Sequence, residues 1–69
     1  MKVSARNSFK GTVKKIIPGA INTEVLLEIA PGVEINAIIT KTSVENLNLT
    51  IGKPAYVMIK SSDVIVAVD

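Results

Sequence analysis

Two Pro-Gly pairs divide the first part of the chain into three β-rich runs, and no other sequence feature constrains the fold as strongly. Proline has no backbone N–H to donate to a sheet, and glycine adopts turn conformations that other residues avoid, so a Pro-Gly pair ends a strand. The pairs are Pro18-Gly19 and Pro31-Gly32. This pattern predicts strands at residues 12–17, 23–29 and 34–40.

Hydrophobic residues alternate along the second of these strands. Val25, Leu27 and Ile29 face one side, opposite Leu26 and two glutamates, which is the period of a strand with one buried face. The turn that follows is short. We therefore expect the second and third strands to form an antiparallel hairpin.

The periodicity changes after the third strand. Thr42 and Glu45 stand three residues apart, as in a capping box, and Val44 and Leu47 fall on one side of a helix. We expect one or two helical turns at residues 42–47, capped by Thr42.

Two further β-rich runs complete the chain. A turn at residues 51–54 precedes a strand at 55–60, and a tight turn at 61–63 leads to a fifth strand at 64–68. This order predicts an all-β fold, a small five-stranded OB-like Greek-key barrel with one short helix between strands 3 and 4. Residues 1–69 are expected to form this single domain. A two-sheet sandwich fits the pattern less economically.

A chain of 69 residues buries only about 60% of its unfolded surface, so its own core is marginal. Disulfides or zinc often supplement such a core, but this chain has no cysteine and no histidine. Its hydrophobic content of 48% is mostly aliphatic, more than a small monomer would leave exposed. We therefore expect subunit interfaces in a homo-oligomer.

The net charge of +2 is too small for the electrostatic footprint of a nucleic-acid or membrane-binding protein, and a small anion fits it better. The start of the chain lacks the apolar run of a signal peptide, and no stretch has the length of a membrane span. We expect a cytoplasmic protein with no nucleic-acid and no membrane partner.

The N-terminal segment is rich in hydrogen-bond donors. Ser4, Ala5 and Arg6 offer a hydroxyl, a backbone N–H and a guanidinium, and no acidic residue precedes Glu24. These groups suit a compact anion. A solvated arginine near a chain start is the plainer interpretation.

Two further donor groups lie downstream. Lys60 and Ser61 stand at the junction of the last two strands, where the chain turns, and Ser43 stands in the expected first helical turn, whose N–H groups attract anions. The plainer interpretations are a solvated hairpin end with turn-forming serines and a helix cap.

Five segments, spread over the whole chain, carry a family resemblance: Ser4-Ala5-Arg6-Asn7, Phe9-Lys10-Gly11, Ile38-Ile39-Thr40 with Ser43-Val44, Leu47-Asn48-Leu49 before Gly52, and Lys60-Ser61-Ser62-Asp63-Val64. In these segments the chain resembles the molbindins, the single-domain Mop proteins. The resemblance implies an OB-like fold that assembles as a hexamer, a trimer of dimers, and binds molybdate or tungstate at subunit interfaces.

The same resemblance implies the site. The metal would be held as its oxyanion, with no direct protein ligands to the metal, no other cofactor and no catalytic residue. Molbindins also carry a second kind of site near the threefold axis, whose residues no motif places here. The expected contacts come from six residues: Ser4, Ala5 through its backbone, Arg6, Ser43, Lys60 and Ser61.

Elementary chemistry explains why donors alone would suit this ligand. Molybdate and tungstate are fully deprotonated dianions at neutral pH, so every oxygen accepts and none donates. Phosphate retains a proton part of the time and would favour an acceptor. Sulfate, also a dianion, has to be rejected by size.

Single-stranded nucleic-acid binding is the alternative function for an OB-like barrel, but it needs stacking platforms, and the only aromatic residues are Phe9 and Tyr56. Catalysis is not expected, because Lys60 and Ser61 are strand neighbours without a third, orienting group. Intracellular storage, buffering and delivery of molybdenum would look alike in sequence.

Overall fold

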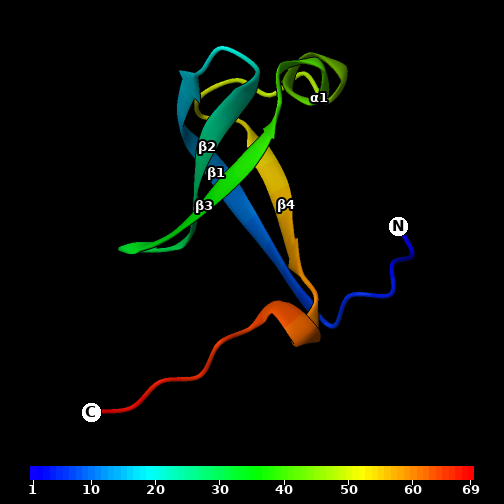
Figure 1. Ribbon diagram of the computed structural model, residues 1–69. Coiled ribbons are helices and arrows are strands. Elements are labelled where there is room, and N and C mark those ends of the chain that lie inside the picture. The colour runs from blue at the N-terminus through cyan, green and yellow to red at the C-terminus, as the bar shows by residue number, and fades with distance from the viewer.

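The computed structural model describes residues 1–69 and is built mainly of strands (Figure 1). Its elements in chain order are β1 (Asn7–Pro18), β2 (Asn22–Ala30), β3 (Val33–Thr40), α1 (Lys41–Asn46), β4 (Pro54–Ile59) and the short 3₁₀ turn η1 (Ser61–Asp63). The strands form one antiparallel sheet in the order β3-β2-β1-β4. The all-β fold with one short helix after the third strand is thereby confirmed.

The long strand β1 organises the sheet because it pairs with two neighbours in succession. Residues 7–12 of β1 pair with β4, and residues 12–18 pair with β2. A bulge between Val13 and Lys15 bends the strand where it changes partner. The backbone N–H of Val13 donates to the carbonyl of Lys53 at 2.9 Å, and its carbonyl accepts from Gly52 at 2.8 Å, so both backbone groups of Val13 are paired at the bend.

The β2–β3 hairpin is confirmed, with the predicted Pro31-Gly32 turn between its strands. Gly32 has φ of 75°, a left-handed conformation that favours glycine. The predicted buried face of β2 is also correct: Val25 and Leu27 are buried and Ile29 packs against them. Burial of these side chains sets the register, since a slip by one residue would expose them.

The core of the single chain is small. Its buried hydrophobic side chains come from β1, β2 and β4 and number four: Val13, Val25, Leu27 and Val57. Many large aliphatic side chains remain exposed, Ile21 and Ile51 among them. The core of the single chain is therefore as small as the chain length predicts.

The predicted fifth strand at residues 64–68 is wrong for the single chain. This segment pairs with no strand, and after η1 it runs away from the sheet (Figure 1). Ile65 is 91% exposed and Val68 is 92% exposed. A strand needs a partner for its backbone groups, and η1 directs the segment away from its own sheet. The single chain is therefore an open half-barrel.

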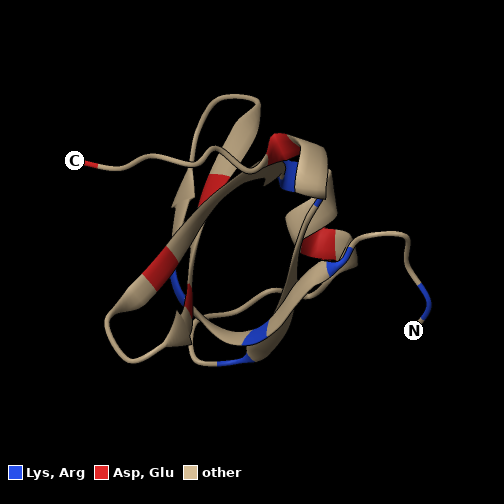
Figure 2. Ribbon diagram, turned by 90° about the horizontal axis from the view of Figure 1, so that it is seen from below, with Lys and Arg blue, Asp and Glu red and all other residues tan.

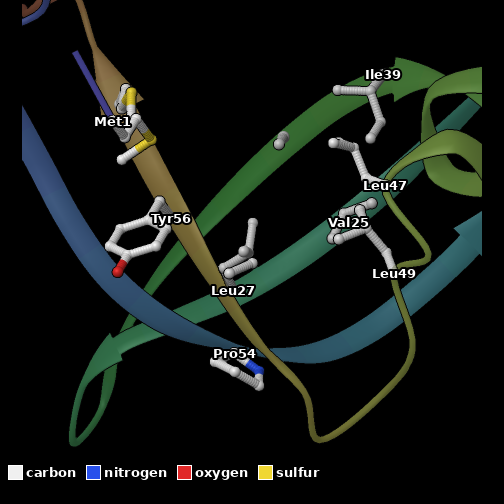
Figure 3. Close-up of a pocket in the computed structure, with 11 residues that line it drawn as sticks. Met1, Val25, Leu27, Ile39, Leu47, Leu49, Pro54 and Tyr56 are labelled. Atoms are coloured by element: carbon white, nitrogen blue, oxygen red, sulfur yellow. The ribbon is translucent and has the colours of Figure 1, made fainter. Parts of the chain in front are cut away.

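An apolar groove of about 420 Å³ lies where a fifth strand would close the barrel. Val25 and Leu27 of β2 form its floor, with Ile39 of β3 on one side and Tyr56 of β4 on the other (Figure 3). Leu49, after α1, closes one end. Ten of the eleven residues that line the groove are hydrophobic, so water is a poor occupant.

Gly11 lies where β1 changes partner, and we predict that Gly11→Ala destabilises the protein by roughly 1–3 kcal/mol. An added Cβ would stand 2.7 Å from the carbonyl oxygen of Glu28 and 3.2 Å from Cγ2 of Ile29, so two paired strands would have to move apart. Urea midpoints at one protein concentration measure the effect. The exposed neighbour Lys10→Ala is the control and should change stability by less than about 0.5 kcal/mol; equal midpoints for wild type and Gly11→Ala would contradict the prediction.

Candidate anion-binding site

Two of the predicted donor groups meet at one corner of the molecule. Asn7, the first residue of β1, lies opposite Ile59, the last residue of β4. Arg6 and Lys60 are the residues directly beyond this pair, one on each chain segment. The N-terminal arm and η1 therefore leave the sheet at the same place (Figure 1).

The side chains at this corner are open to solvent. Ser4, Arg6, Lys60 and Ser61 are exposed and Ala5 is half-buried. None of these residues, and not Ser43 either, lines a cavity of the single chain. The single chain therefore presents donors on a surface and has no enclosed space for a ligand at this corner.

Neither cation at the corner is neutralised by a carboxylate. The only ion pair of the structure joins Lys14 Nζ to Glu28 Oε1 at 4.0 Å, on the outer side of the sheet. The acidic residues of the sheet lie on β2 and β3, on the opposite side of the molecule from the N-terminal arm (Figure 2). Asp63 is the nearby acid in η1; its backbone N–H donates to the carbonyl of Lys60 at 2.9 Å.

The polar groups at the corner are hydrogen-bond donors. No three His, Cys, Asp or Glu residues gather anywhere in the structure to hold a metal ion. The groups at the corner are an ammonium, a guanidinium, hydroxyls and backbone N–H groups, all of which donate hydrogen bonds to an anion.

Ser43 lies far from this corner. It follows β3, whose last residue, Thr40, lies opposite Asn22 at the end of the sheet where β1 finishes. The corner and α1 are thus at opposite ends of the twelve-residue β1 (Figure 1). A strand rises about 3.3 Å per residue, so one small anion has no means of contacting Ser43 and Arg6 of the same chain.

The helix cap differs from the sequence prediction. Thr40, not Thr42, is the N-cap: its Oγ1 accepts from the backbone N–H of Ser43 at 3.0 Å and donates to Ser43 Oγ at 2.9 Å. The helix begins at Lys41, earlier than expected, because the extended end of β3 places Thr40 at the cap. Thr40 and Ser43 have the same spacing as Thr42 and Glu45, and that spacing is the signal in the sequence that points to the observed cap.

The domain model called "TOBE domain" matches residues 3–66. The chain is thus a TOBE domain by class. A "Probable molybdenum-pterin-binding protein" of Haemophilus influenzae is 41% identical over the whole length of both chains. This chain belongs to the family of molybdenum-pterin-binding proteins, the molbindins, as its motifs indicated.

Solved structures agree with this assignment. MopII from Clostridium pasteurianum superimposes with a TM-score of 0.89 at 40% identity, covering 97% of this chain and 100% of MopII. The cytoplasmic molybdate-binding protein ModG, in a crystal form with molybdate bound, also gives a TM-score of 0.89, at 46% identity over 94% of this chain and 46% of ModG.

Longer proteins contain the same module. ModE of Azotobacter vinelandii, described as a molybdenum transport protein, is 44% identical over all of this chain, which spans only 26% of ModE. The chain therefore corresponds to about a quarter of that relative. As for membranes, none of the helices has both the length and the apolar character needed to cross one.

The observed cap leads to a prediction about α1. Thr40→Val keeps the size and β-branching of the side chain but removes the oxygen that accepts from Ser43, and should destabilise the protein by about 1 kcal/mol. Thr42→Val is the matched control and should leave the urea midpoint nearly unchanged. A larger effect at Thr42 than at Thr40 would contradict the observed cap.

Proposed function

We propose that this chain binds molybdate, and tungstate, at contacts between copies of itself. One observation carries the proposal: Arg6 and Lys60 lie together at an exposed corner, without a neutralising carboxylate and without a cavity in the single chain. Full-length similarity to molybdenum-pterin-binding proteins supports the choice of ligand. Enclosure of the ligand then requires a second chain.

The donor set matches a tetrahedral dianion. Arg6 and Lys60 supply two positive charges against the two negative charges of the ligand, which lowers the cost of burying it. Hydroxyls of Ser4 and Ser61 and the backbone N–H of Ala5 complete the hydrogen bonds on this side. Ser43 contributes from another copy, because its own chain holds it at the far end of β1.

The open half-barrel supports the assembly. Residues 64–68 form an exposed, extended apolar segment, and the groove between β3 and β4 is an apolar channel with an unpaired strand edge on each side. We propose that this segment of one copy fills the groove of another, where its backbone finds partners and its side chains leave water. Lys60 and Ser61 directly precede the segment, so this exchange places them at the interface.

The family resemblance extends the proposal to a hexamer built as a trimer of dimers, working in the cytoplasm. The ModG neighbour is described as cytoplasmic. Storage, buffering or delivery of molybdenum follows from reversible binding without chemistry, since a site made of donors holds the oxyanion but offers no general base. The chain is proposed to be a binding protein and not an enzyme.

Removal of Arg6 tests the site. Arg6→Ala should weaken molybdate binding on the order of tenfold to a hundredfold, because hydrogen bonds to charged groups contribute about 1.5–3 kcal/mol. Isothermal titration calorimetry with molybdate measures the affinity, and circular dichroism checks that the fold is kept. Lys15→Ala removes an exposed cation elsewhere on β1 and is the control. Unchanged affinity in Arg6→Ala would exclude Arg6 from the site; no heat with the wild type would overturn the proposed function.

The assembly has its own test. Val66→Asp places a charge on the apolar C-terminal segment and should shift the protein to the mass of a single chain in analytical ultracentrifugation. Val66→Thr has nearly the same shape, keeps β-branching, and should remain oligomeric. An oligomer of unchanged mass for Val66→Asp would show that the segment does not hold the copies together.

A further inference from the structure

The side chain of Asn7 connects the two halves of the proposed site. Its Nδ2 donates to the backbone carbonyl of Ile59 at 3.3 Å, across 52 residues of sequence. Asn7 is half-buried, whereas the charged donors beside it are exposed. It directly follows Arg6 in the sequence, but it is not one of the six predicted contact residues.

This contact constrains both segments at once. On one side, Asn7 is bonded through a single peptide to Arg6. On the other, the Ile59 carbonyl belongs to the peptide plane that also contains the N–H of Lys60. A trans peptide is planar and its C=O and N–H point in opposite directions, so anchoring the carbonyl also orients the Lys60 N–H.

The Asn7–Ile59 contact can orient both segments because it lies at the end of a strand ladder. The ladder between β1 and β4 ends at the Asn7–Ile59 pair, and beyond it neither the N-terminal arm nor residue 60 belongs to a strand. Lys60 is the N-cap residue of η1 and has an extended backbone. A terminal ladder pair frays easily, and one extra side-chain hydrogen bond resists that fraying.

We propose that Asn7 is a positioning residue for the oxyanion site, which holds the arm carrying Arg6 against the turn carrying Lys60 and Ser61 before the ligand arrives. The inference rests on the proposed function. Without this bond, the two segments would have to be ordered during binding, and that ordering lowers affinity. Asn7 itself need not touch the ligand.

The experiment compares Asn7→Ala with the wild type, using molybdate as the probe. Calorimetry should show binding weakened by roughly three- to tenfold, less than the loss expected for Arg6→Ala. In the ligand-free protein, NMR should show faster hydrogen exchange of the Lys60 and Ser61 amides, while amides in the middle of β2 exchange at the wild-type rate. A merely structural role would accelerate both regions.

Two more variants keep the test decisive. Asn7→Val, whose β-branched side chain favours a strand, should reproduce both effects if Asn7→Ala folds poorly. Asn36→Ala removes an exposed asparagine from β3 and should change neither readout. Wild-type affinity in the Asn7 variants, with the wild type binding molybdate, overturns this inference alone. A wild type that ignores molybdate overturns the proposed function, and unchanged exchange at Lys60 and Ser61 then overturns the positioning role as well.

Discussion

β3 and β4 are both edge strands, and the strip between them carries unpaired backbone groups above an apolar groove. An edge strand with unpaired backbone groups can pair with another chain. The stability of the rest of the structure depends on what pairs with these edges and covers the apolar groove. Four buried hydrophobic side chains make a weak core for the single chain. The segment at residues 64–68, apolar and extended, has the chemistry to fill the same gap in a neighbour. We therefore infer that the stability of the fold is linked to the proposed association of copies.

The proposed ligand binds at the corner that carries Arg6 and Lys60. These two cations lie on adjoining chain segments, and a dianion bound between chains would attract both of them. Binding to the assembled form would also stabilise it, because a ligand that prefers one state shifts the equilibrium toward that state. In the proposed function, the open barrel, the exposed C-terminal segment and the donor-rich corner would act together to bind an oxyanion as copies associate.

Much of the local structure was predictable from the sequence. The Pro-Gly pairs ended strands where expected, because the covalent limits of these residues act without tertiary help. The candidate site was less accessible. Arg6 and Lys60 are far apart in sequence and meet only through the β1–β4 ladder. The predicted cap, Thr42, was wrong: Thr40 also has a partner three residues on, and the extended end of β3 places Thr40 at the cap.

The sequence by itself determined the turns that end β1 and β2, the buried face of β2, the donor-rich character of the N-terminal arm and membership of the molbindin family. Only the tertiary structure decided that residues 64–68 leave their own sheet, that Ser43 stands at the far end from Arg6, and that Asn7 anchors Ile59. The physical reason is the range of the interactions. Periodicity and turn chemistry act over a few residues, whereas strand partners and shared corners depend on which distant segments the sheet brings together.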